Sequence, residues 1–134
     1  MTITHHEIPI RVRYSETDAM GYLHHANHFQ YFEMGRTELF RVQGGDYRQM
    51  EADGLFLVVT QLKCSYHKPA RYDDCLTLET TLSKVTSVKL VHDYRLLRDA
   101  ELLATATSTL ACVNRKGVVQ RIASAGPPLQ IEPR

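Results

Sequence analysis

The sequence has few cysteines, almost no net charge and no long apolar run, and each absence excludes a class of protein. The three cysteines, Cys64, Cys75 and Cys112, lie far apart, so they match neither a disulfide framework nor a zinc site. They suit a reducing compartment. Lys plus Arg total 16 against 15 Asp plus Glu, and this balance argues against a protein that grips a nucleic-acid backbone. The longest strongly apolar run, residues 55–59, is far too short to span a bilayer.

What is present is the composition of an ordinary globular protein. The chain has 134 residues, of which 43% are hydrophobic and 23% charged, and no repeat or low-complexity block divides it. We therefore expect one domain over residues 1–134, with an irregular C-terminal tail that contains Pro127, Pro128 and Pro133. The N-terminus lacks the basic flank and apolar stretch of a signal peptide, so we expect a cytoplasmic protein without membrane insertion.

Hydrophobic periodicity predicts one strand, one long helix and then four strands. Asn27, followed three residues later by Gln30, resembles a capping box and predicts the start of the helix, and Gly44-Gly45 predicts its end. A further short helical turn is expected between Asp46 and Asp53. The alternating segments predict a turn at residues 98–101 and strands at 8–14, 55–66, 76–85, 88–97 and 102–113.

This order of elements predicts an α+β fold with a single buried helix. Short connections between consecutive strands favour an antiparallel sheet. The helix has an unusually broad apolar face, which indicates that the sheet wraps around it. Gly35 lies in this face and would let the helix approach its neighbour closely.

Three histidines cluster at the start of the predicted helix: His24, His25 and His28. His24 and His28 have the spacing of two helical zinc ligands, but the glutamate that follows the first histidine in zinc proteases is missing. If Asn27 caps the helix, His24 also lies outside it. We therefore predict no metal site and interpret the histidines as loop and pocket-wall residues.

Asp18 is the strongest candidate for chemistry. It follows the first strand, lies in a loop with Gly21, and precedes a largely apolar helix. A partly desolvated carboxylate is a stronger base, which suits nucleophilic or general-base work. Free N–H groups at the helix start could hold a developing oxyanion nearby. The residues alone leave a second interpretation open, because a loop aspartate is more often a turn former.

The segment around Asp18 resembles the 4-hydroxybenzoyl-CoA thioesterase family, and most closely its acyl-CoA thioesterase branch associated with the Tol-Pal gene cluster. The similarity covers roughly residues 6–120 and includes the turn at residues 68–74. The stretch that carries it reads Tyr14-Ser15-Glu16-Thr17-Asp18-Ala19-Met20-Gly21-Tyr22-Leu23-His24-His25-Ala26-Asn27-His28-Phe29, with Glu33, Arg36, Thr37 and Glu38 downstream.

The resemblance implies a hotdog fold, in which a five-stranded antiparallel sheet wraps around a central helix, and an acyl-CoA thioesterase that acts on a short-chain or aromatic acyl group. It implies that Asp18 is the catalytic carboxylate, either as nucleophile or as general base. It also implies that the backbone N–H of His25 polarises the thioester carbonyl and that Gly21 lets the loop turn close to the substrate. His24 and His28 are expected to line the pocket. No cofactor is implied, because CoA is part of the substrate.

The family also suggests where CoA and other subunits bind. Relatives pair their sheets into dimers or tetramers and bind acyl-CoA between subunits, so we expect a homodimer or homotetramer. Ser87 and Lys89 lie where relatives often place CoA contacts, although both could be ordinary strand-end residues facing solvent. The charges of Arg36, Glu38 and Arg41 are interpreted as structural or interfacial.

Two other functions remain as alternatives. Hotdog dehydratases act on acyl-carrier-protein substrates with a histidine in a His-Phe-Pro-Gly-type segment, whereas here His28-Phe29 is followed by Gln30-Tyr31. A hotdog protein that binds acyl-CoA without catalysis is the second alternative, and the presence of Asp18 argues against it.

Overall fold

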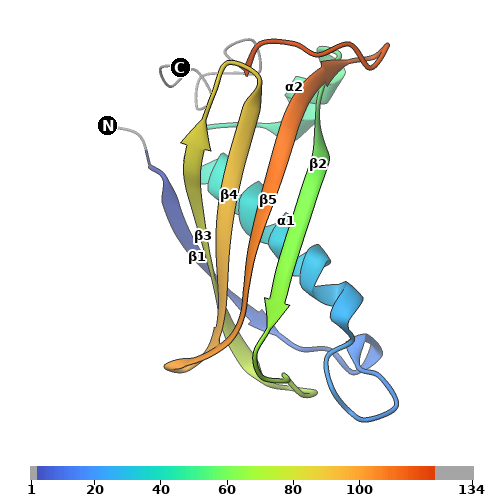
Figure 1. Cartoon of the computed structure of the whole chain (residues 1–134), viewed down its shortest axis with the longest axis vertical. Helices are drawn as coiled ribbons and strands as arrows, with labels where there is room; N and C mark the ends of the chain where they lie inside the picture. The colour runs from blue at the N-terminus through green and yellow to red at the C-terminus, as the bar shows by residue number, and fades with distance from the viewer. Residues whose placement is uncertain (1–2, 123–134) are drawn as a thin grey trace.

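The computed structural model describes residues 3–122 and contains a five-stranded antiparallel sheet with one long helix packed against it. The strands are β1 (His5–Arg11), β2 (Leu55–Tyr66), β3 (Cys75–Val85), β4 (Lys89–Arg98) and β5 (Glu101–Asn114). They lie in the order β1-β3-β4-β5-β2, so β1 and β2 form the two edges. Figure 1 shows the long helix α1 (His25–Val42) lying along one face of this sheet. The predicted α+β architecture is confirmed.

Most predicted strand boundaries agree with the structure, but the first strand was placed too late. It was predicted at 8–14 and is observed at His5–Arg11, opposite β3. Val12 continues the apolar alternation beyond the end of β1. Its N–H and its carbonyl both bond to the turn at residues 73–74, and the N–H donates to the carbonyl of Asp74 at 3.0 Å. The chain then turns into a short 3-10 helix, η1 (Tyr14–Glu16).

The helix α1 approaches the sheet most closely at Gly35. A Cβ atom at this position would lie 2.7 Å from Leu78 Cδ2 and closer still to Thr80 Oγ1, so a larger residue would push the helix off β3. On either side of Gly35, the side chains of Phe32 and Leu39 are fully buried against the sheet. Burying a side chain of this size contributes roughly 1.5–3 kcal/mol, which explains why the helix packs here.

The remaining elements connect the helix to the sheet. Helix α2 (Tyr47–Ala52) is capped by Asp46, whose Oδ1 accepts a 3.1 Å hydrogen bond from the N–H of Gln49, and it lies within the predicted 46–53 segment. The hairpin between β4 and β5 turns at the predicted place, with Asp99 at a φ of 54°. Of the cysteines, Cys75 is exposed and Cys112 is buried. The tail with Pro127, Pro128 and Pro133 lies outside the described residues.

Candidate active site

A buried carboxylate, Glu16, holds the segment between β1 and α1 against the helix. Glu16 is 7% exposed, and its Oε1 accepts hydrogen bonds of 2.8 Å from the N–H of Arg13 and from the phenol of Tyr31. Its backbone carbonyl accepts from the N–H of His24 at 2.9 Å and from the side-chain amide of Asn27 at 2.8 Å. One residue therefore fixes both ends of the loop that contains Asp18.

These bonds also explain why α1 begins earlier than predicted. The helix starts at His25, and its N-cap is His24, whose Nδ1 accepts a 3.1 Å hydrogen bond from the N–H of Ala26. Asn27 was predicted to be the cap, but it lies inside the first turn because its amide bonds to Glu16 instead. The prediction that His24 precedes the helix is correct.

The carboxylate of Asp18 is oriented by its own loop. Its Oδ1 accepts hydrogen bonds from the N–H groups of Met20 at 2.9 Å and Tyr22 at 3.1 Å. Gly21 closes this turn at a φ of +81°, a conformation that favours glycine, and donates its N–H to the carbonyl of Asp18 at 3.0 Å. In the part of the chain that the structure describes, Oδ2 of Asp18 accepts no hydrogen bond. One carboxylate oxygen thus holds the turn and the other is available.

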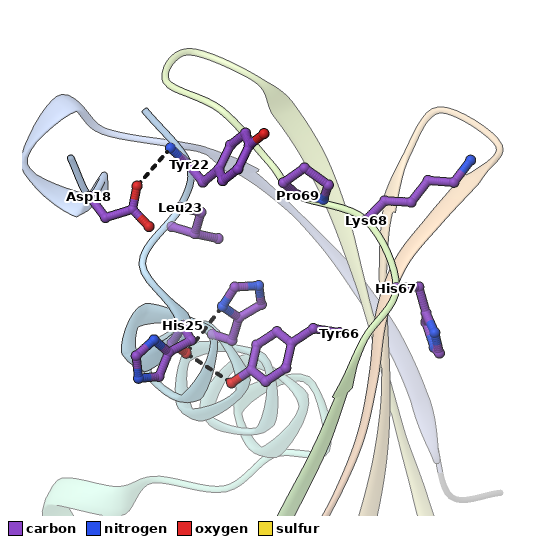
Figure 2. A pocket seen from close by; sticks show the side chains of 9 residues that line it. Asp18, Tyr22, Leu23, His25, Tyr66, His67, Lys68 and Pro69 are labelled. Atoms are coloured by element: carbon purple, nitrogen blue, oxygen red, sulfur yellow. Dashed lines mark hydrogen bonds between the residues drawn. The ribbon is translucent and has the colours of Figure 1, made fainter. Parts of the chain in front are cut away.

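Asp18 borders a pocket of about 300 Å³ between its loop, the start of α1 and the segment that follows β2 (Figure 2). No residue of β1 lines this pocket. The loop 67–69 reaches this position because the N–H groups of His67 and Lys68 both bond to the carbonyl of Leu103, at 2.8 and 3.1 Å. The pocket is lined by Asp18, Tyr22, Leu23, His25, His28, Tyr66, His67, Lys68 and Pro69.

His25 is the first residue of α1 and lies in the wall of this pocket. Within residues 3–122 its N–H donates no hydrogen bond, as expected for a donor in the first turn of a helix. Its carbonyl accepts from the phenol of Tyr66 at 3.0 Å and bonds to Nδ1 of His28 at 3.2 Å (Figure 2). The main chain of His25 is therefore held firmly while its N–H stays free.

This chain is similar in sequence and in fold to known thioesterases. Residues 12–130 match the thioesterase-like superfamily. The chain belongs to this superfamily. It is 37% identical over 108 residues to the YneP protein of Bacillus subtilis, covering 80% of this chain and 78% of YneP. It is 36% identical over 107 residues to the acyl-CoA thioesterase YbgC of Haemophilus influenzae, covering 79% of each chain.

A solved relative supports the same assignment. The DHNA-CoA thioesterase from Staphylococcus aureus superimposes with a TM-score of 0.88 at 27% sequence identity, covering 91% of this chain and 83% of that one. The sheet of this thioesterase-like protein, with α1 packed against it, is therefore the predicted hotdog fold.

His28 and Tyr66 form a second layer behind His25. Their rings pack edge to face with centroids 4.7 Å apart. Burial lowers the pKa of His28, although the carbonyl of His25 partly opposes that shift, so the imidazole is neutral at pH 7. Burial raises the pKa of Tyr66 to about 12, so the phenol keeps its proton and donates to His25. Neither ring carries charge into the pocket at neutral pH.

The clustered histidines do not converge on a common point. Nδ1 of His24 is used by the helix cap, Nδ1 of His28 bonds to the carbonyl of His25, and the rings of His24 and His25 stack with centroids 4.2 Å apart. Among the described residues, no three His, Cys, Asp or Glu side chains are arranged to hold a metal ion.

Over residues 3–122, no helix is long and apolar enough to cross a membrane.

The other predicted site residues are distributed unevenly. His28 is among the residues that line the pocket, whereas Gly21 and His24 stand beside it, in the turn and at the helix cap. Ser87 and Lys89 lie at the turn between β3 and β4, at the opposite end of the sheet from the start of α1 (Figure 1). One chain therefore does not bring them to the Asp18 pocket.

The wall of the pocket at the end of β2 was not predicted from the sequence. Tyr66, His67 and Lys68 all line the pocket, yet they lie more than 40 residues after Asp18 in the sequence. The only available signal was the turn at residues 68–74, which the family resemblance included without assigning a role. Lys68 pairs with Glu101 at 2.9 Å, which holds this wall on the β4–β5 hairpin.

Proposed function

We propose that this thioesterase-like protein hydrolyses an acyl-CoA thioester, with Asp18 as the catalytic carboxylate. One observation carries the proposal: a carboxylate with an available oxygen and a helix N-terminus with a free N–H border the same pocket. Thioester hydrolysis needs these two groups, one to supply or activate a nucleophile and one to stabilise an oxyanion.

Two routes use Asp18, and both give the same products. As a general base, Asp18 takes a proton from water while the resulting hydroxide attacks the thioester carbonyl. As a nucleophile, the carboxylate attacks the carbonyl itself and forms a mixed anhydride, which water then cleaves. In each route the C–S bond breaks, the thiolate of CoA leaves and takes up a proton, and a free carboxylic acid remains.

The N–H of His25 is proposed as the oxyanion donor. When the carbonyl carbon becomes tetrahedral, negative charge develops on its oxygen, and a fixed N–H donor stabilises that charge without reorganising. The bonds from Tyr66 and His28 to the carbonyl of His25 support this role, because they hold the main chain in place before the substrate arrives. His28, His24 and Gly21 shape the surroundings rather than react.

We further propose a short-chain or aromatic acyl group, in line with the resemblance to the 4-hydroxybenzoyl-CoA thioesterase family. A pocket of about 300 Å³ with several aromatic rings in its wall suits a small or flat acyl group. No cofactor is required, since Asp18, a backbone N–H and water supply the chemistry and CoA belongs to the substrate. Ser87 and Lys89 could reach that CoA only from another copy of the chain, so this part of the proposal includes a homodimer or homotetramer.

The experiment that tests the function is a panel of acyl-CoA thioesters assayed for release of free thiol. We expect turnover with short-chain or aromatic acyl groups. Binding of acyl-CoA without thiol release would favour the non-catalytic binding protein. Hydration of an enoyl thioester, or the reverse elimination, would favour the dehydratase. Against that function, this chain has His-Phe-Gln-Tyr in place of the His-Phe-Pro-Gly-type segment of the dehydratases.

A further inference from the structure

A buried positive charge lies under α1, away from the Asp18 pocket. Arg36 projects from the middle of the helix and is only 9% exposed. It lies next to two buried residues of the sheet, His92 and Tyr94, and Tyr94 bonds in turn to buried Ser108. A guanidinium remains charged at any physiological pH, so a buried arginine needs acceptors around it.

The protein supplies few acceptors to Arg36. Its NH1 group reaches the phenol of Tyr94 at 3.5 Å, a long hydrogen bond to a neutral oxygen that already shares a 2.6 Å bond with Ser108 Oγ. Among residues 3–122 the carboxylate nearest to Arg36 is that of Glu33, 3.8 Å from NH2, and the Glu33 side chain is 71% exposed. Within residues 3–122, most of the five N–H donors of Arg36 therefore have no hydrogen-bond partner.

Arg36 also lines a second pocket. In the described part of the chain, the buried side-chain atoms without a hydrogen-bond partner are Thr80 Oγ1 and His92 Nδ1, and no nitrogen of Arg36 is among them. The unbonded nitrogens of Arg36 are therefore not completely enclosed by protein, and Arg36 lines a pocket of about 230 Å³ between α1, α2, β2 and β5. None of its lining residues belongs to the Asp18 pocket; they are Glu33, Arg36, Thr37, Tyr47, Glu51, Leu57 and Leu110.

We propose that this second pocket binds a single carboxylate group carried on an apolar or aromatic body. The planar fork of a guanidinium matches a carboxylate with two parallel hydrogen bonds, and the partly desolvated setting strengthens them. Leu57, Leu110 and the ring of Tyr47 offer apolar wall to the rest of such a ligand. Burial raises the pKa of Tyr47 to about 12, so its phenol stays neutral and adds no repulsion.

The two glutamates that line this pocket limit the negative charge that a ligand can carry. Glu33 and Glu51 add two negative charges against the single charge of Arg36. Both residues are exposed, so water and salt screen much of their repulsion toward a monoanion. A phosphate with two charges would meet about twice that repulsion. The site should therefore prefer a monocarboxylate, and this inference holds whether or not the chain is a thioesterase.

The test is a titration of the full-length, isotope-labelled protein with benzoate, followed by NMR at the Arg36 side chain and the methyl groups of Leu57 and Leu110. We expect saturable shifts at these groups that inorganic phosphate does not produce. Arg36→Met should abolish them, and Arg41→Met, which removes an exposed arginine of the same helix, should leave them unchanged. Glu33→Gln should tighten binding several-fold, because it removes repulsion and frees the guanidinium.

Several results would overturn the site. One is that the NMR signal of the Arg36 side chain does not respond to benzoate. That result would mean that water fills the pocket or that a second copy of the chain covers it. Shifts confined to the Asp18 pocket would mean that benzoate binds there as a product-like acid. Retained binding in Arg36→Met would exclude the guanidinium. If Arg36→Met fails to fold, Arg36→Lys tests the same point, since an ammonium keeps the charge but loses the two-pronged fit. Unchanged affinity in that variant would count against the proposal.

Discussion

The phenol of Tyr31 donates a 2.8 Å hydrogen bond to the carboxylate of Glu16, and it joins the interior of α1 to the loop that carries Asp18. Tyr31 is 1% exposed and Glu16 is 7% exposed, so water is largely excluded from this bond. Burial raises the pKa of Glu16, but hydrogen bonds from Arg13 and Tyr31 lower it by more, and the net pKa falls below 4.5. The carboxylate is thus charged at neutral pH and acts as a fixed acceptor.

Glu16→Ala should destabilise the protein by about 2–3 kcal/mol, because it leaves the buried phenol of Tyr31 without an acceptor. Glu16→Gln keeps an acceptor oxygen and should cost less. If Glu16 also positions the Asp18 loop, kcat should fall in Glu16→Ala at temperatures where the variant is fully folded. The kcat of Glu16→Gln should lie between those of Glu16→Ala and the wild type. Denaturant unfolding and kcat measure the two effects separately. Wild-type values of both in Glu16→Ala would remove Glu16 from this role.

Asp18→Asn should preserve the fold and lower thioester hydrolysis by about 10²–10⁴-fold, the range of a positioned base. The amide oxygen can still accept from Met20 and Tyr22, so the turn is kept, while the amide nitrogen replaces the available oxygen. Thiol release in the variant, with circular dichroism as a check of folding, measures the effect. Turnover close to wild type would mean that another group does the chemistry.

The regular elements of this fold were predictable because their signals are local. Alternation from 76 to 113 marks one buried and one less buried face in each of three consecutive strands, and short turns join them. Gly35 was predictable as a close approach because a glycine in a broad apolar face lets the helix backbone come close to its neighbour, and a Cβ there would contact Leu78. Asp18 is a candidate catalytic residue through the family motif, and its role stays a prediction, whereas the turn that Gly21 predicted beside it is present.

The errors come from contacts between distant segments. Asn27 has the residue type of an N-cap, but its amide is taken by the carbonyl of Glu16, eleven positions earlier. His24 therefore caps the helix, although histidine is not a preferred cap residue. Nothing in the sequence around Glu16 or Arg36 shows that these charged residues are buried, because the groups that surround them come from other elements.

Acid should weaken the protein through His92. Burial, and then the charge of Arg36, lowers the pKa of His92 from 6.5 to about 4. Between these values the unfolded chain binds a proton that the folded chain does not, so stability falls as the pH drops from 6.5 to 4. The loss is on the order of 3 kcal/mol. His92→Phe should remove this part of the pH dependence in unfolding experiments, and the matched control His6→Gln should not. An unchanged pH profile in His92→Phe would contradict the prediction.

We expect copies of this chain to associate with one another through the edge strand β2. The opposite edge, β1, is short and contains Pro9, which discourages pairing with another strand. Strand β2 has 12 residues with one charged side chain, Lys63, and exposes Val58 and Val59. Sedimentation should give a dimer or larger species at micromolar concentration, and Val59→Lys should weaken it. A fully active monomer of 15.3 kDa would contradict both the prediction and the proposed role of a second copy.

The roles of the backbone N–H and of the side chain of His25 can be tested separately, because His25 is the first residue of α1. Proline is well tolerated at the first position of a helix, where its missing N–H breaks no helical bond. The preceding residue, His24, has φ −64° and ψ 135°, the extended conformation that proline requires before it. His25→Pro should therefore fold normally while losing the proposed oxyanion donor.

Loss of one such donor costs about 10²–10³-fold in turnover, so His25→Pro should be nearly inactive. His25→Ala keeps the N–H and should retain a substantial part of the activity, with changed substrate preference at most. Thermal unfolding and CoA binding must be close to wild type in both variants for the comparison to hold. If His25→Ala is instead as inactive as Asp18→Asn, the imidazole itself takes part, and the mechanism becomes acid–base catalysis by a His–Asp pair.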